Sequence, residues 1–229
     1  MPRKKIKDWE IRKEFIRRNL DFFKSTFFVN ELGVNSKNIM DVAALDFDKN
    51  IFYGFEIKSE ADNLQRLYKQ LSTYVTFFNI VYVVSHMKHT EAILALIENN
   101  PFMRNVGYIE VTPIEGESED GCTLDFKELR KAKFTAPRFD TFIRNLDMEE
   151  LTVLCEGKGQ YLGWESKKLL VDKIKRMVTM DEIYEHMKSK AYRYYYKTCP
   201  LCGSHLYYNK TNRKGKLVSR CFECECEIE

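Results

Sequence analysis

The chain of 229 residues lacks any apolar run long enough to cross a membrane. A membrane-spanning helix needs roughly 18 or more consecutive apolar residues, and none of the runs here approaches that length. The basic start MPRKKIKDWEIRKEFIRR also lacks the apolar segment of a secretory signal peptide. These absences predict a cytoplasmic protein with no membrane partner. The basic N-terminal segment is itself consistent with a nuclear localisation signal, a DNA contact or a solvated helix face.

A large excess of one charge is also missing. The chain has 37 Lys and Arg against 34 Asp and Glu, and a formal net charge of +3 does not by itself indicate nucleic-acid binding. Internal repeats and low-complexity tracts are absent, and the hydrophobic share of 44% is ordinary for a globular protein with a real core. The length suits one sizeable domain with appendages or two small domains. Any functional signal must therefore come from local patterns.

The first 112 residues have the alternating apolar patterns of an α/β domain. Helical spacing predicts three helices, over 9–28, 61–78 and 89–100, with a loop over 30–38. Short apolar and β-branched runs predict four strands, over 39–47, 51–59, 79–85 and 106–112. The first two of these strands are joined by the turn-like DKN, which favours a hairpin. The later strands are separated by helices, which is typical of a mixed sheet flanked by helices.

Three further segments follow the core, which we place at 1–112. The acidic, glycine-containing stretch at 113–136 predicts an exposed loop or linker. A helical subdomain is predicted over 137–190, with two short helices around a glycine-rich turn. The turn lacks the Lys-Ser/Thr ending of a phosphate loop. This subdomain resembles small helix-extended-helix DNA-binding modules, with Lys158, Lys167 and Lys168 available, although a role in packing alone is the alternative. The last segment spans 191–229.

The predicted strand IFYGFEIKS places two opposite charges on one face. Alternate side chains of a strand share a face, so Glu56 and Lys58 point one way while Phe55 and Ile57 point the other. Burial of an unpaired charge is costly, so the simplest interpretation is an edge strand with an exposed ion pair. A hairpin would bring Asp41 opposite Glu56, and two close carboxylates repel each other unless a cation lies between them.

Carboxylate oxygens such as those of Asp41 and Glu56 suit Mg²⁺ or Mn²⁺. Glu31, which follows the first helix, could supply a third carboxylate. Asp46 is an alternative ligand if the strand register is shifted by one residue. In the next helix, Arg66, Gln70 and Tyr74 recur every four residues and therefore form one polar stripe. We interpret His86 and His89 as residues of a solvated loop.

These residues resemble the PD-(D/E)XK nuclease superfamily. The segment IMD with Asp41 is followed by FEIKS with Glu56 and Lys58, and QLSTY with Gln70 and Tyr74 matches the QxxxY helix motif of the RecB-like branch. Met40 stands where the pattern often has proline. The longer string GFEIKSEADNLQRLYKQLSTYVTFFNIVYVV resembles bacterial and phage members of that superfamily. The resemblance covers most of residues 25–190 and implies a restriction-endonuclease-like fold.

The resemblance also implies the chemistry of the site. Asp41, Glu56, the backbone carbonyl of Ile57 and Glu31 would hold one or two Mg²⁺ or Mn²⁺ ions, which activate a water molecule. Lys58 would orient that water and stabilise the negative charge that develops on the phosphate. The pair in the QxxxY motif, Gln70 and Tyr74, would position the active-site groups or the nucleic-acid backbone. The implied activity is hydrolysis of phosphodiester bonds, with DNA as the first candidate substrate.

The last 31 residues contain five of the seven cysteines. Cys199 and Cys202 form one Cys-x2-Cys pair, and Cys221 and Cys224 form a second, with eighteen residues between the pairs. Two such pairs typically close a tetrahedral Zn²⁺ site, so the segment is similar to a zinc ribbon. Cys226 and His205 are possible substitute ligands.

The segment between the cysteine pairs is basic and contains no acidic residue. Basic and aromatic side chains interleaved in this way suit phosphate contact and base stacking. The candidate nucleic-acid-binding residues are Arg66 in the core and, in the ribbon, Tyr207, Tyr208, Lys210, Arg213, Lys214, Lys216 and Arg220. We therefore expect a metal-dependent nuclease whose ribbon assists DNA binding. The alternatives are a non-catalytic nucleic-acid-binding protein or an adaptor that docks a protein, and the chain could act as a homodimer or with a partner protein.

Overall fold

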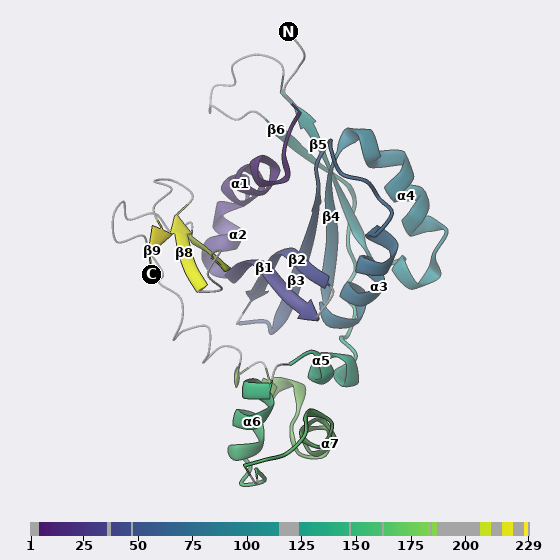
Figure 1. Cartoon of the computed structure of the whole chain (residues 1–229). Coiled ribbons are helices and arrows are strands. Elements are labelled where there is room, and N and C mark those ends of the chain that lie inside the picture. The colour runs from purple at the N-terminus through teal and green to yellow at the C-terminus, as the bar shows by residue number, and fades with distance from the viewer. Residues whose placement is uncertain are drawn as a thin grey trace. The chain divides into compact units, whose positions relative to one another are not determined.

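A computed structural model describes most of the chain (Figure 1). The described residues are 5–35, 38–46, 48–114, 124–146, 148–161, 163–183, 185–186, 207–211, 217–221 and 227–228. The chain divides into two compact units. One comprises residues 1–135 and 196–229, and the other comprises residues 136–195.

A six-stranded mixed sheet forms the centre of the first unit. The strands are β1 (Phe27–Asn35), β2 (Asn38–Asp46), β3 (Ile51–Lys58), β4 (Ile80–His86), β5 (Gly107–Pro113) and β6 (Leu124–Arg130), and they lie in that order across the sheet. Strands β1, β2 and β3 pair antiparallel, β3, β4 and β5 pair parallel, and β6 pairs antiparallel with β5. The predicted mixed α/β class and the hairpin are confirmed, and the structure adds that β3, β4 and β5 are parallel neighbours connected through helices.

Helices α1 (Asp8–Arg18) and α2 (Leu20–Ser25) cover one face of the sheet (Figure 1). Their buried residues join the apolar side chains of β3 that alternate with the charged ones. Phe55 is the hub of this core, since its ring lies 5.1 Å from that of Phe15 and 6.0 Å from that of Phe23. α1 ends at Asn19, whose amide side chain donates to the carbonyl of Phe15 over 2.8 Å.

The opposite face of β3 is covered by α3 (Leu67–Phe77), which connects β3 to β4. The ring of Phe52 packs 4.7 Å from that of Phe78, and Gly54 leaves room for the same ring. β4 connects through a short 3₁₀ turn, Met87–His89, to α4 (Thr90–Glu98), and a second turn at Pro101–Met103 leads into β5. Because β3 is an internal strand with both faces covered, its charged side chains cannot form an ordinary surface pair.

The segment before the hairpin differs from the sequence prediction. The single helix expected over 9–28 is divided into α1 and α2 at Asn19, and the loop expected over 30–38 is largely strand β1. β1 is irregular, because Glu31 has a positive φ of 61° and the register shifts between Gly33 and Asn35. Residues typical of turns therefore occupy a strand whose backbone is paired by β2.

The predicted linker at 113–136 is also corrected. β6 lies inside this range and forms the outer strand of the sheet. Leu124 is buried and Phe126 packs against the core, while most of the other β6 side chains are exposed. A short outer strand with many charged residues has too little apolar alternation to stand out in the sequence.

The second unit contains α5 (Phe139–Asn145), α6 (Met148–Glu156) and α7 (Lys167–Met177). Its small core includes Phe142, Leu151 and Ile174. Gly159 and Gly163, in the segment between α6 and α7, have positive φ values of 65° and 89°, which glycine adopts without strain. Inside this unit Lys173 forms an ion pair with the buried carboxylate of Glu165.

Three short strands form a second sheet near the C-terminus. They are β7 (Tyr207–Thr211), β8 (Leu217–Cys221) and β9 (Glu227–Ile228), and β8 pairs antiparallel with both neighbours. Among the helices that the structure describes, none is long and apolar enough to cross a membrane.

Candidate functional site

Asp41 lies where strands β2 and β3 stop pairing. The last pair of the ladder is Val42 with Phe55, and Asp41 is the next position, opposite Glu56. One carboxylate oxygen, Oδ2, accepts the backbone N–H of Ile57 over 2.7 Å. The side chain therefore accepts a strand amide at the point where the ladder ends.

Glu56 is the most deeply buried charged group of this site, with only 1% of its surface exposed. Its Oε1 accepts a hydrogen bond of 2.6 Å from the ammonium of Lys58 and another of 2.6 Å from the amide of Gln70. Its other oxygen, Oε2, is buried and has no hydrogen-bond partner among the described residues. Two donors thus fix the carboxylate, and one oxygen keeps its capacity to accept.

Tyr74 connects α3 to the strand that carries Asp41. Its hydroxyl donates to the carbonyl of Ile39 over 2.7 Å, two residues before Asp41. The amide of Asn38 donates to the hydroxyl of Thr73 over 3.1 Å and gives a second connection between the same elements. Tyr74 therefore holds the start of β2 in place, while Gln70, one turn earlier on α3, reaches Glu56.

Arg12 is the residue of the site that the sequence interpretation missed. From α1, its Nη2 lies 3.2 Å from Oδ1 of Asp41 and 3.3 Å from Oδ2 of Asp8, and its Nη1 lies 3.4 Å from Oε1 of Glu31. The sequence spacing could have pointed to Arg12, because it is four residues after Asp8 and four before the buried Ile16. It therefore lies at the margin of the apolar stripe of the helix. Arginine at such a position is often solvated, so the pattern alone does not distinguish it.

Glu31 reaches the site through Arg12. It lies on β1 between the residues paired with Val42 and Met40, so it is opposite Asp41. Its side chain remains 55% exposed and contacts the arginine. Among the described residues there is no group of three or more His, Cys, Asp or Glu side chains placed to hold a metal. Glu31 is therefore an outer member of the cluster.

Burial dominates the protonation of the two inner carboxylates. It raises the pKa of Asp41 to about 7, with a further contribution from the negative charge of Glu56, against the opposing effects of Arg12, the Ile57 amide and Lys58. Burial also raises the pKa of Glu56, although Lys58, Tyr74 and Gln70 oppose this. The pKa of Tyr74 is raised by burial and then by the negative charge of Glu56. Two neighbouring carboxylates, one buried and one partly buried, whose ionised forms are both disfavoured, are a place where a cation would be stabilised.

A divalent cation fits these donors. Asp41 and Glu56 offer hard oxygen ligands, and the buried Oε2 of Glu56 is available to accept. Mg²⁺ is commonly held by one or two carboxylates, with waters and substrate phosphates completing its shell, so two inner carboxylates suffice. Ile57, whose carbonyl the resemblance implicates, is tied to the site by its amide.

Several other candidate residues lie elsewhere. Arg66 is exposed at the N-cap of α3, one turn before Gln70. Asp46, the alternative ligand, closes the β2–β3 turn, where burial raises its pKa but hydrogen bonds from Lys49 outweigh burial and lower it. The interpretation of His86 and His89 as solvated residues is wrong. Both are buried, because the turn after β4 folds back toward the end of β3.

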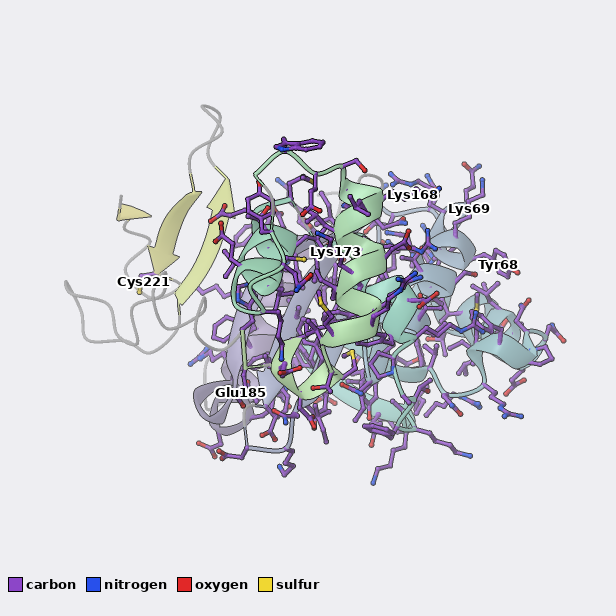
Figure 2. All side chains as sticks on the ribbon, turned by 90° about the horizontal axis from the view of Figure 1, so that it is seen from below. Tyr68, Lys69, Lys168, Lys173, Glu185 and Cys221 are labelled. Carbon is purple, nitrogen blue, oxygen red and sulfur yellow. The ribbon has the colours of Figure 1, made fainter. Side chains whose placement is uncertain are left out.

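Only one of the four predicted zinc ligands lies in the described part of the chain. Cys221 is buried on β8 (Figure 2), whereas Cys199, Cys202, Cys224 and the substitute candidates Cys226 and His205 lie outside the described residues. Of the predicted nucleic-acid contacts, Tyr207, Tyr208 and Lys210 belong to β7 and Arg220 belongs to β8. Arg213, Lys214 and Lys216 also lie outside the described residues. The zinc site stays a prediction.

The fold and the site define a mixed α/β protein with a buried and a partly buried carboxylate on adjacent strands. Comparison with family models shows that residues 5–209 match the family of bacteriophage P4 protein cII. The chain belongs to that family. No curated protein and no solved structure matches the chain.

Proposed function

We propose that the protein is a metal-dependent nuclease that hydrolyses phosphodiester bonds, with DNA as its substrate. The observation that carries the proposal is the buried Glu56 opposite Asp41: one of its oxygens is fixed by Lys58 and Gln70, and the other has no hydrogen-bond partner among the described residues. A purely structural ion pair would not need a second carboxylate beside it. The arrangement also agrees with the PD-(D/E)XK pattern of the sequence, which motivates the reaction class.

Each side chain has a distinct task in this proposal. Asp41 and Glu56 would hold a divalent ion, which when bound lowers the pKa of a water ligand and neutralises charge on the phosphate. Lys58 lies at the end of β3, with its ammonium 2.6 Å from Glu56, so it is positioned to orient the attacking water and stabilise the developing negative charge. Gln70 keeps Glu56 in one orientation.

The surface beside the site suits a polyanionic substrate. Arg66, Tyr68 and Lys69 are exposed at the start of α3, the helix that also carries Gln70, and the first turn of this helix contains no acidic residue. Figure 2 shows the side chains of Tyr68 and Lys69 pointing away from the ribbon. Cations can bind phosphates and an exposed aromatic ring can stack on a base. The ribbon, with its predicted Zn²⁺ ion, would add further basic contacts.

The decisive test is an assay of the full chain on single-stranded, double-stranded, nicked and branched DNA and on RNA, with Mg²⁺, with Mn²⁺ and with chelator. We expect cleavage only with a divalent ion. Lys58→Ala should reduce the rate by about 100-fold or more, because such groups typically contribute that much. Lys49→Ala is the matched control, since Lys49 is an exposed lysine of the β2–β3 turn, at the other end of β3.

Two results would count against the proposal. One is no cleavage of any substrate with either ion, and the other is equal cleavage by Lys58→Ala and the wild type. Salt-sensitive binding without cleavage would instead support the non-catalytic nucleic-acid-binding alternative.

A further inference from the structure

Arg12 occupies the place of a counter-ion beside Asp41. Its side chain is only 10% exposed, and its two terminal nitrogens contact three carboxylates, those of Asp8, Glu31 and Asp41, at 3.2–3.4 Å. An arginine keeps its positive charge at any physiological pH. A permanent charge is therefore held against the carboxylate that would bind a metal ion.

The two inner carboxylates differ in how far their oxygens are engaged. Asp41 uses Oδ1 for Arg12 and Oδ2 for the Ile57 amide. Glu56 uses only Oε1, and its Oε2 has no hydrogen-bond partner in the described part of the chain. A cation bound at the pair would therefore find a buried, unpaired oxygen on Glu56 but a guanidinium beside Asp41.

We propose that Arg12 is a built-in competitor of the divalent cation, which lowers the affinity of the site for metal by neutralising Oδ1 of Asp41. The inference rests on the proposed function, which assigns Asp41 and Glu56 to the cation. Arg12 also contacts the carboxylates of Asp8 and Glu31, so its charge has other partners when a metal ion takes Oδ1. Binding of metal then replaces one positive charge by another at the same oxygen.

The test is direct titration of Mn²⁺ into the full chain without nucleic acid, with free Mn²⁺ followed by electron paramagnetic resonance. We expect Arg12→Gln and Arg12→Met to bind Mn²⁺ about tenfold more tightly than the wild type, because a unit charge in contact with a partly buried ligand is removed. Arg12→Lys should stay close to the wild type, since it keeps the charge. Arg17→Gln is the matched control and should leave the affinity unchanged, because Arg17 is an exposed arginine of the same helix that pairs with Glu14.

Asp41→Asn identifies the site, since it should abolish this Mn²⁺ binding. The inference is overturned if the wild type shows binding that depends on Asp41 and both Arg12→Gln and Arg12→Met bind equally or more weakly. It is also overturned if Arg12→Lys tightens binding as much as Arg12→Gln does. If the wild type has no Mn²⁺ binding that depends on Asp41, the proposed metal site itself fails. Circular dichroism verifies that each variant is folded, and Arg12→Met, which keeps an apolar stem, decides the matter if Arg12→Gln does not fold.

Discussion

The carboxylate of Asp41 accepts the backbone amide of Ile57 over 2.7 Å, one position beyond the last pair of the β2–β3 ladder. Ile57 lies between Glu56 and Lys58. The backbone of β3 that presents these two side chains therefore also fixes the carboxylate of Asp41. The apolar side chain of Ile57 points into the opposite core. The three charged groups are thus positioned by one short stretch of β3, and this relationship leads to several predictions.

Asp41→Asn should flatten the pH dependence of stability in the absence of metal. The folded-state pKa of about 7 lies above the ordinary value of about 4, so the folded chain binds a proton that the unfolded chain has released. The contribution of Asp41 to stability is therefore fully present below pH 4 and is lost as the pH rises through 7, by on the order of 4 kcal/mol. Urea unfolding with chelator at several pH values measures the effect. The prediction would be contradicted if the free energy of unfolding changed with pH equally steeply in the wild type and in Asp41→Asn.

If Glu56 binds the metal ion as proposed, Gln70→Ala should weaken that role without unfolding the chain. The amide of Gln70 donates to Oε1 over 2.6 Å, and a hydrogen bond to a charged group contributes about 1.5–3 kcal/mol. We expect a decrease in kcat of about tenfold or more, measured with saturating Mn²⁺ and the best substrate. Gln65→Ala provides the control, because Gln65 is exposed just before α3. An equal decrease in kcat in both variants would show that Gln70 has no specific role.

Gly107→Ala should destabilise the sheet. A Cβ atom at this position would lie 2.7 Å from the backbone nitrogen of Ala132 and would also overlap the ring of Tyr82. The hydroxyl of Tyr82 is held by Ala132 and Glu128, so the ring cannot easily move aside. We expect a loss of about 2–3 kcal/mol in the free energy of unfolding.

The control for this substitution is Gly33→Ala on β1. No atom lies within 4 Å of the Cβ position of residue 33, so the change should be close to neutral. Chemical denaturation of both variants gives the comparison, and equal stability of the two would show that the close approach at Gly107 is tolerated.

Removal of the four predicted zinc ligands should release one metal ion. Elemental analysis of the purified wild type should find about one Zn²⁺ per chain, as expected for a site of four thiolates. The variant in which Cys199, Cys202, Cys221 and Cys224 are all serine should lose it. Unchanged zinc content in that variant would refute the assignment.

The sequence predicts the hairpin and the alternation of later strands with helices because their signals are local. The turn after β2, the alternation within β3 and the helical period of α3 each depend on residues close together in the chain. β1 and β6 are different, since their strand character comes from pairing with a neighbour. Asn30, Gly33 and Asn35 are typical of turns, and β6 carries mostly charged side chains. Only the hydrogen bonds offered by β2 and β5 make these segments strands.

The sequence by itself determined that Glu56 and Lys58 share one face of a strand and that Gln70 and Tyr74 share one face of a helix, because the backbone period sets these relations. It left open whether the strand lies at the edge or inside the sheet. The tertiary structure decided that question, since β4 and α3 enclose β3 and bury Glu56. It also brought Arg12 to Asp41 from 29 residues away. Contacts of that kind depend on how helices and sheet pack, which no local period encodes.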